Sequence, residues 1–381
     1  MVKGLSPLDI KLLRDIWHMR GQVIAVGIIV ACGVAIMVMA LGTLSTLSAS
    51  RDAYYERYRF ADVFASVRRA PENIASRLHE ISGVQTVETR IVRLVILRIQ
   101  NVEEPANAQI VSLPDEGESI LNRIVLFQGR YPEPRSPDEI IISNAFAEAN
   151  RLETGDAIEA VMNGRLRSLT VVGIGDSPEF IYALGPGTLL PDDRLFGIFW
   201  MRRRAMEAAF DLDGAFNNVS LTVAPGTDTD TVIDLADDVL APYGGTGAFD
   251  RSDQLSNAFV DSEMNQLKTM AQIIPAVFLI VSAVLIHSIL NRLIQTERQQ
   301  IGLIKAFGYS RSEITWHYLK FAIAITAGGV IAGFALGFVL QNLITNLYAE
   351  TFRIPDLTWR VDGFALVAGA IAALGSAIAG S

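Results

Sequence analysis

The chain has 381 residues, of which 50% are hydrophobic and only 19% are charged, against roughly 25% charged residues in an ordinary soluble domain. Four runs contain no Asp, Glu, Lys or Arg: residues 21–50, 269–291, 321–349 and 363–381. Because a bilayer core of about 30 Å needs about 20 apolar residues in a helix, these runs predict four transmembrane helices and argue against a single soluble core.

The charge is unevenly distributed along the chain, whose formal net charge is −9. Residues 1–20 carry four basic and two acidic groups, and residues 292–320 carry five basic and two acidic groups. Residues 51–268 instead carry 21 basic and 34 acidic groups. Since short segments rich in Lys and Arg stay cytoplasmic, we expect the N-terminus and residues 292–320 inside, residues 51–268 outside, and residues 350–362 as a short outer loop.

The first segment, residues 1–20, is predicted to be a cytoplasmic amphipathic helix that leads into the first span. Ser6 is a suitable N-cap, and the proline after it fits the first helical position. One face is apolar at spacings of three and four residues: Ile10, Leu13 and Trp17. A helix lying on the inner leaflet and a plain extension of the span both fit this pattern.

The outer block, residues 51–268, is predicted to be an α+β extracytoplasmic domain. Residues 60–97 and residues 217–251 each show a strand, helix, strand pattern. Two such patterns, separated in the sequence by a long segment, indicate ferredoxin-like βαβ units. The segment between them, at about residues 106–205, is predicted to be an inserted β-rich subdomain. Within the insert, Asn163-Gly164 between two apolar runs predicts a tight hairpin.

Residues with recognisable chemistry are few. The sequence has no G-x-x-x-x-G-K-[ST] motif, so we expect no nucleotide bound through a P-loop. The single cysteine, Cys32, excludes an intramolecular disulfide, and the four histidines are scattered. We therefore expect no catalytic, cofactor-binding or metal-ligating residues and no nucleic-acid partner. Residues 202–204 are three arginines that form a solvated face, pair with the domain's excess acid or bind an anionic ligand.

The third and fourth spans are rich in small residues. Three glycines in the third span recur every four residues: Gly329, Gly333 and Gly337. Small residues at this spacing let helices approach closely in lipid, so we expect a helix-packing face, either between spans or between subunits. The fourth span, residues 363–381, ends without a basic flank, and we interpret it as truncated.

The stretch "ERQQIGLIKAFGYSRSEI", residues 297–314, is basic and lies between the second and third spans. We predict a short helix over residues 297–308 that Gly308 ends in a left-handed conformation. Ser310-x-x-Glu313 predicts a capping box at the start of the next helix. Gly302 and Ala306 give the helix a small apolar face, and we expect its charges to be exposed: Glu297, Arg298 and Lys305. Its spacing fits a surface gripped by another protein and equally fits a solvated linker.

This stretch resembles the cytoplasmic loop of the FtsX-like permease family, the MacB-type ABC transporter permease subunits. The similarity lies in an E-R-x-x-I-G-x-x-K-A-x-G pattern, carried here by Glu297, Arg298, Ile301, Gly302, Lys305, Ala306 and Gly308. The outer block is similar to the MacB-like periplasmic core domain in a second run, at Gly129, Arg130, Pro132, Glu139, Ala145, Leu152, Gly155 and Asp156. The resemblance covers the whole chain.

The resemblance implies a permease subunit in the bacterial cytoplasmic (inner) membrane, without an ATPase site of its own. The helix with the pattern, including Ile304, would be the ATPase-coupling helix. ATP and Mg would be used by a separate cytoplasmic ABC ATPase dimer, whose movement the spans pass to the outer domain, a mechanism called mechanotransmission.

Further expected partners are membrane lipid, a second permease copy or a second permease half, and a periplasmic adaptor in some family members. Some members carry two permease units, and this chain resembles the first of them. The alternative is a membrane-anchored ligand sensor or regulatory protein, but residues 1–20 and 292–320 are too short for an output domain.

Overall fold

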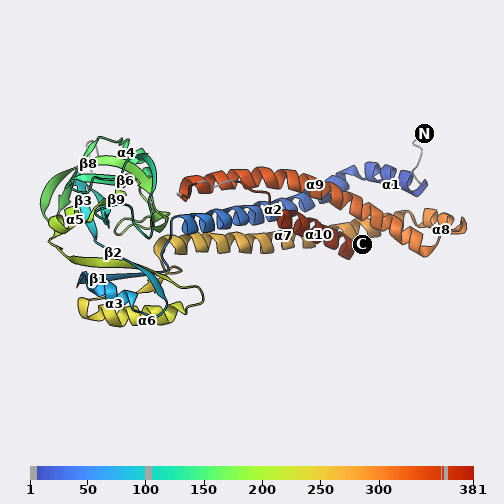
Figure 1. Cartoon of the computed structure of the whole chain (residues 1–381). Helices are drawn as coiled ribbons and strands as arrows, with labels where there is room; N and C mark the ends of the chain where they lie inside the picture. The colour runs from blue at the N-terminus through green and yellow to red at the C-terminus, as the bar shows by residue number, and fades with distance from the viewer. Residues whose placement is uncertain (1–6, 99–104, 353, 356–358) are drawn as a thin grey trace. The chain divides into compact units, whose positions relative to one another are not determined.

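The computed structural model describes residues 7–98, 105–352, 354–355 and 359–381, and divides into two compact units (Figure 1). The helical unit comprises Met1–Ser50, Glu263–Glu350 and Asp356–Ser381, and the β unit comprises Arg51–Ser262 and Thr351–Pro355. The predicted Ser6 cap lies outside the described residues, as do residues 353 and 356–358 of the predicted outer loop.

The helical unit is built from six helices among the described residues. They are α1 (Pro7–His18), α2 (Arg20–Arg57), α7 (Leu255–Thr296), α8 (Arg298–Ala306), α9 (Arg311–Thr351) and α10 (Gly363–Gly380). Four of them, α2, α7, α9 and α10, are long and apolar enough to cross a membrane. Three begin or end beyond the charge-free runs, because a charged residue marks the edge of the apolar region but does not end a helix.

The outward surfaces of these long helices are apolar. Ile280 on α7, Ile331 on α9 and Ile371 on α10 are 64%, 71% and 66% exposed. A soluble protein rarely exposes contiguous apolar surface on this scale. These helices therefore have the surface of a membrane bundle, whose solvent is lipid.

The three glycines of α9 face α2 within the same chain. A Cβ added at Gly333 would lie 2.8 Å from Cβ of Val34 and 2.9 Å from the carbonyl oxygen of Ala31. Gly329 and Gly337 meet Val30 and Val38 in the same way. These three valines are each at most 1% exposed. The structure thus places the predicted packing face between two spans, where only glycine leaves room for the valines.

The β unit contains a four-stranded sheet in the order β11-β1-β10-β2. Its strands are β1 (Val63–Pro71), β2 (Val84–Arg90), β10 (Ala215–Val223) and β11 (Phe249–Asp250). β10 pairs antiparallel with both β1 and β2. Helices α3 (Ile74–His79) and α6 (Thr229–Leu240) lie against this sheet (Figure 1). They bury a common core with it that includes Leu78, Phe216 and Val232.

The second sheet has seven strands in the order β5-β8-β6-β9-β4-β3-β7. They are β3 (Val92–Arg98), β4 (Ala106–Leu113), β5 (Val125–Gly129), β6 (Glu139–Ser143), β7 (Ala157–Met162), β8 (Arg165–Asp176) and β9 (Phe196–Arg202). β7 also pairs with β8, which closes the sheet from β8 to β7 into a barrel. Helices α4 (Asn144–Asn150) and α5 (Arg203–Phe210) pack on its core.

Residues 83–97, predicted as the second strand of one βαβ unit, in fact form parts of two strands. β2 and β3 part at Ile91, which is fully buried and whose backbone N–H donates to Ser112 Oγ at 2.8 Å. The second sheet therefore begins at Val92, and the predicted boundary at about residue 106 is wrong. No glycine or proline marks the break between β2 and β3, so the sequence of this apolar run does not reveal it.

The predicted hairpin is confirmed, with φ of 48° at Asn163 and 75° at Gly164.

Candidate functional site

Helix α8 is held between two defined ends. At its C-terminus, Gly308 has φ of 96° and its N–H donates to the carbonyl of Lys305 at 3.0 Å. The next helix starts with the predicted capping box, in which Ser310 N donates to Glu313 Oε2 at 2.8 Å and Glu313 N donates to Ser310 Oγ at 3.2 Å. Both predictions are confirmed. Short turns thus join α8 directly to α7 and α9.

The residue before α8, Glu297, forms an ion pair with α1 and a hydrogen bond with α9. Lys11 Nζ lies 2.5 Å from Glu297 Oε2, and both side chains are 12% exposed. The Tyr318 hydroxyl donates to the same oxygen at 3.2 Å. The prediction that Glu297 is exposed is therefore wrong. A residue 286 positions away in sequence covers it, and a helical pattern in the loop alone does not reveal such a partner.

Helix α1 packs on the bundle and still shows an apolar stripe. A second ion pair, between Lys320 Nζ and Asp9 Oδ1 at 3.0 Å, holds it against α9. Partly buried residues Leu12 and Ile16 contact the bundle core. The predicted apolar face, Ile10, Leu13 and Trp17, points outward. Residues 7–18 are thus fixed to the bundle by one face and exposed by the other.

One side of α8 is apolar and uncovered. We call it the α8 outer face, and it consists of Gly302, Leu303, Ala306 and Phe307. Leu303 is 63% and Phe307 is 76% exposed, and a Cβ added at Gly302 would meet no atom within 4 Å. The sequence predicted the small residues of this face but missed both large ones. Their signal was available, because each directly follows a small residue of the face.

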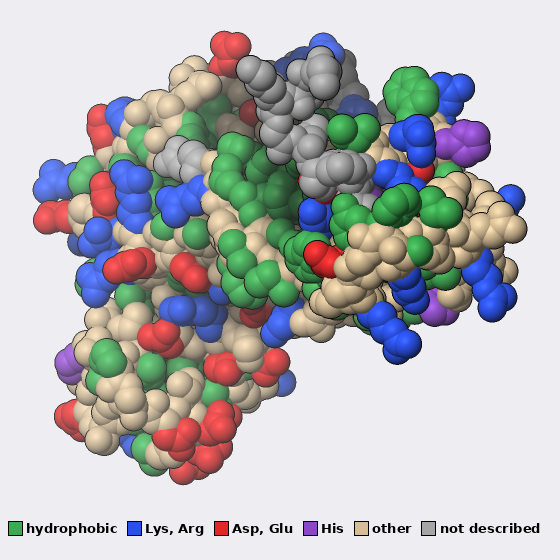
Figure 2. Space-filling model, turned by 90° about the vertical axis from the view of Figure 1, so that its right-hand side faces the viewer, with side chains coloured by type: hydrophobic (Ala, Val, Ile, Leu, Met, Phe, Trp, Pro, Cys, Tyr) green, Lys and Arg blue, Asp and Glu red, His purple; other side chains and the backbone are tan. Residues whose placement is uncertain are grey.

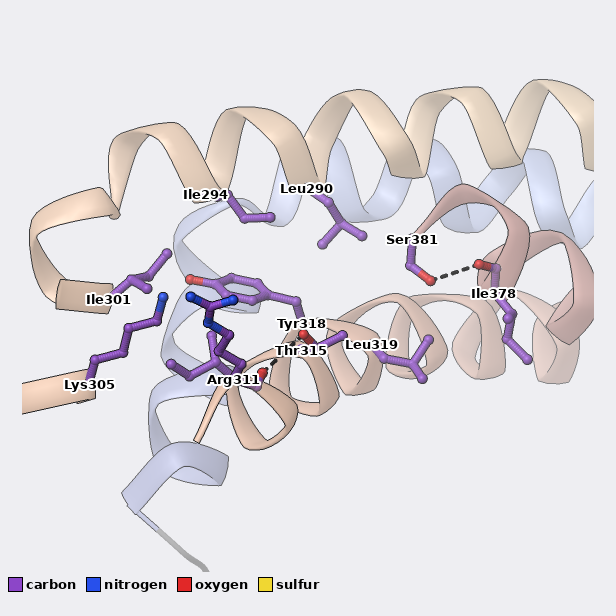
Figure 3. Close-up of a pocket in the computed structure, with 11 residues that line it drawn as sticks. Leu290, Ile294, Ile301, Lys305, Arg311, Thr315, Tyr318, Leu319, Ile378 and Ser381 are labelled. Carbon is purple, nitrogen blue, oxygen red and sulfur yellow. Dashed lines mark hydrogen bonds between the residues drawn. The ribbon is translucent and has the colours of Figure 1, made fainter. Parts of the chain in front are cut away.

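The two other charges predicted to be exposed on α8, Arg298 and Lys305, are exposed. Ile301 and Lys305 line a cavity of about 470 Å³ together with residues of α7, α9 and α10 (Figure 3). The side chain of Ile304 lies outside the described residues. The bundle end that carries α1 and α8 shows Lys and Arg side chains interspersed with hydrophobic ones (Figure 2).

The three consecutive arginines of the β unit make intramolecular contacts. Arg202 Nη1 donates to the carbonyls of Pro114 at 2.6 Å and Gly117 at 2.8 Å, and burial lowers its pKa. Arg203 Nε pairs with Glu207 at 3.1 Å. The backbone N–H of Arg204 donates to Asp115 Oδ1, in the loop after β4, at 2.8 Å. These contacts favour the structural role that the sequence left open.

The second run of the family pattern also has a physical basis. Arg130 binds Glu139 through two hydrogen bonds of 2.8 and 2.7 Å, and the bond from Arg130 lowers the pKa of Glu139. Gly129 has φ of 78°, and a Cβ there would overlap the backbone of β8.

Within residues 7–98, 105–352, 354–355 and 359–381, no group of three or more His, Cys, Asp or Glu side chains could hold a metal ion.

Two protein-family models match the chain. Residues 272–381 match the FtsX-like permease C-terminal model, and residues 23–239, more than half of the chain, match the MacB-like periplasmic core domain model. An uncharacterized ABC transporter permease of Mycoplasma genitalium is 23% identical over 203 residues. That match covers 49% of this chain and 15% of the relative, so the chain spans a small part of that protein's length.

Two solved structures with some likeness to the chain are extracytoplasmic domains of other proteins. The periplasmic region of MacB from Actinobacillus actinomycetemcomitans is 10% identical, with a TM-score of 0.34, and the match covers 56% of this chain and 95% of that one. The extracellular domain of the noncanonic ABC-type transporter YknZ from Gram-positive bacteria is 14% identical, with a TM-score of 0.33, over 50% of this chain and 98% of that one.

Proposed function

Because the chain belongs to the FtsX-like permease family and carries a MacB-like periplasmic core domain, we propose that it couples ATP hydrolysis by a separate ATPase to movement of its β unit. In this proposal the chain is an ABC transporter permease that works by mechanotransmission and exports or extracts an envelope substrate. The ATP and Mg are bound by the partner, and this chain supplies the surface that the partner moves.

The observation that carries the proposal is the α8 outer face. An exposed Leu and Phe beside small residues form a compact apolar contact surface, of the kind that a protein partner buries. Since α8 joins α7 and α9 through short turns and Glu297 holds α1, a push on α8 reaches three helices at once. A solvated linker needs neither the anchored ends nor the apolar surface.

The partners follow from this geometry and the family. An ABC ATPase dimer would bind two α8 outer faces, which requires a second copy of this chain or a second permease half. The basic segments that carry α1 and α8 support a cytoplasmic position for both, in a bacterial inner membrane. A periplasmic adaptor would contact the β unit.

The β unit would be the moving part outside the membrane. Its four-stranded sheet, with β10 between β1 and β2 and with β1 between β11 and β10, supports the ferredoxin-like interpretation. The closed second sheet adds a separate body with its own core. Two bodies that each keep their own core can change their relative position without unfolding.

Co-purification tests the proposal. The protein would be isolated from its native membrane as wild type and as Gly302→Glu, and ATP hydrolysis would be assayed in each sample. The substitution puts a charge on the α8 outer face in open space, so α8 should stay folded. Gln300→Glu adds the same charge elsewhere on α8, where it lines a different cavity, and serves as the matched control.

We expect an ATPase with wild type and Gln300→Glu and its loss with Gly302→Glu. An ATPase that stays bound to Gly302→Glu as strongly as to wild type would rule out the α8 outer face as the contact. If no ATPase accompanies correctly inserted wild type, the ligand-sensor alternative would replace the proposal.

A further inference from the structure

The cavity behind α8 has a charged end and an apolar end (Figure 3). Lys305 of α8 and Arg311 of α9 point into the end next to α8, near Tyr318. Leu290 of α7 and Ile378 of α10 lie toward the other end. The volume is about 470 Å³, which is within the usual range for small-molecule sites.

No Asp or Glu side chain lines the cavity that Lys305 and Arg311 face. Neither cation forms an ion pair with any Asp or Glu side chain in the described part of the chain. Glu297, which accepts a hydrogen bond from the cavity residue Tyr318, is already paired with Lys11. Two like charges facing one space repel each other, and a bound anion would remove that repulsion.

The position of the cavity along the helices limits what the anion is. Leu290 belongs to the charge-free run that ends at residue 291, whereas Lys305 and Arg311 lie in the basic segment between two such runs. The cavity therefore crosses the level at which hydrocarbon gives way to polar headgroups. A soluble phosphate or an acidic peptide would leave the apolar end unfilled.

We propose that this cavity binds one anionic phospholipid of the leaflet on the α8 side. Its phosphate lies between Lys305 and Arg311, and an acyl chain follows Leu290, Leu319 and Ile378. The lipid thereby links α8 to α9. Lipid binding needs no ATPase, so this inference goes beyond the proposed function and does not depend on it.

Native mass spectrometry of the full chain in detergent tests the proposal. Dioleoyl phosphatidylglycerol would be titrated against dioleoyl phosphatidylcholine, which has the same chains and no net charge. The test variant is Lys305→Gln with Arg311→Gln. The matched control is Arg292→Gln with Arg298→Gln, which removes two nearby cations that do not line the cavity. Thr315→Trp keeps both charges and fills the cavity with an indole.

We expect phosphatidylglycerol to bind more tightly than phosphatidylcholine. The test variant should bind it about thirtyfold more weakly, equivalent to about 2 kcal/mol for two cations near a headgroup. Thr315→Trp should weaken it as well, and the control variant should not. Equal weakening in the control, or binding that Thr315→Trp leaves intact, would overturn the proposal.

Two competition experiments test whether the bound anion is a lipid, a free phosphate compound or a peptide. Glycerophosphoglycerol, the headgroup without chains, should not displace the lipid at equal concentration; displacement would show a phosphate site instead of a lipid site. The same holds for an acidic peptide, whose displacement of the lipid would show a protein-docking site. Each variant's unfolding temperature, measured in lipid-free detergent, should match wild type.

Discussion

The helical unit and the β unit hold their cores together by different means. In the helical unit, valines of α2 fit into the spaces left by glycines of α9. In the β unit the largest fully buried side chains are Phe146, Phe199 and Phe216. The difference follows from the solvent. Lipid is as apolar as a buried leucine, so only close packing favours contact between helices, whereas water drives large side chains inside.

Polar contacts differ in the same way. The β unit buries a complete network in which Arg90 binds Glu179 through distances of 2.5 and 2.9 Å. Asn122 Nδ2 also donates to Glu179 at 3.0 Å, and Gln254 Nε2 donates to its backbone carbonyl at 2.8 Å. The ion pairs of the helical unit that fix α1, at Lys11 and Lys320, instead join α1 to Glu297 beside α8 and to α9. Paired charged side chains are thus part of the buried core of the β unit, whereas in the helical unit they join α1 to its neighbouring helices.

Breaking the buried pair should have the largest effect. Arg90→Met leaves the Glu179 carboxylate buried without its partner, which costs about 3–5 kcal/mol. Amide hydrogen exchange should show lost protection in β10 and unchanged protection in α9. The double variant Arg90→Met with Glu179→Leu should recover most of the protection. If the single variant keeps wild-type exchange in β10, the network does not stabilise the β unit.

Filling the helix contact should have a somewhat smaller effect, in the other unit. Gly333→Val forces a Cβ to within 2.8 Å of Val34 and 2.9 Å of a backbone oxygen, and such overpacking costs about 1–3 kcal/mol. Gly328→Val is the matched control, because its Cβ would meet nothing within 4 Å. Thermal unfolding in detergent should separate the two variants. Equal melting temperatures would mean that α2 and α9 do not pack as described.

The smallest effect concerns a single carboxyl of the β unit. Burial raises the pKa of Glu88, although hydrogen bonds from residues 119–121 and the charge of Arg90 oppose the shift. A raised folded-state pKa means that the contribution to stability is complete below the unfolded value of about 4.3 and is lost as pH rises through the folded value. Glu88→Gln should therefore match wild type near pH 4 and be more stable at neutral pH, by less than about 1 kcal/mol.

This gain can be followed by the fluorescence of Trp200, in a background where the other three tryptophans are phenylalanine. Trp200 is 3% exposed and reports on the β unit alone. A difference between the variants that is largest at pH 4 and vanishes at neutral pH would contradict the assignment.

Features set by neighbouring residues could be predicted from the sequence. The capping box at Ser310 and the hairpin at Asn163 depend on residues within a few positions, and both are present. The two strand–helix–strand patterns are present too. What failed depends on distant partners: Lys11 covers Glu297 from another helix, and Ile91 turns the chain from one sheet into the other. The apolar pair on α8, Leu303 and Phe307, was missed for a different reason: each directly follows a small residue of the predicted face, and that neighbouring position was not used.

The contact between α2 and α9 also fixes a direction. Val30 meets Gly329, Val34 meets Gly333 and Val38 meets Gly337, so residue numbers rise together along the pair and the helices run parallel. Two helices that cross the membrane in the same direction must have an odd number of membrane-spanning helices between them in the sequence. Helix α7 is that helix. The first residues of α2 and α9 therefore emerge on the same membrane face, beside α1 and α8. Inverting the whole protein would carry both of these short helices to the other face together, and no inversion could separate them.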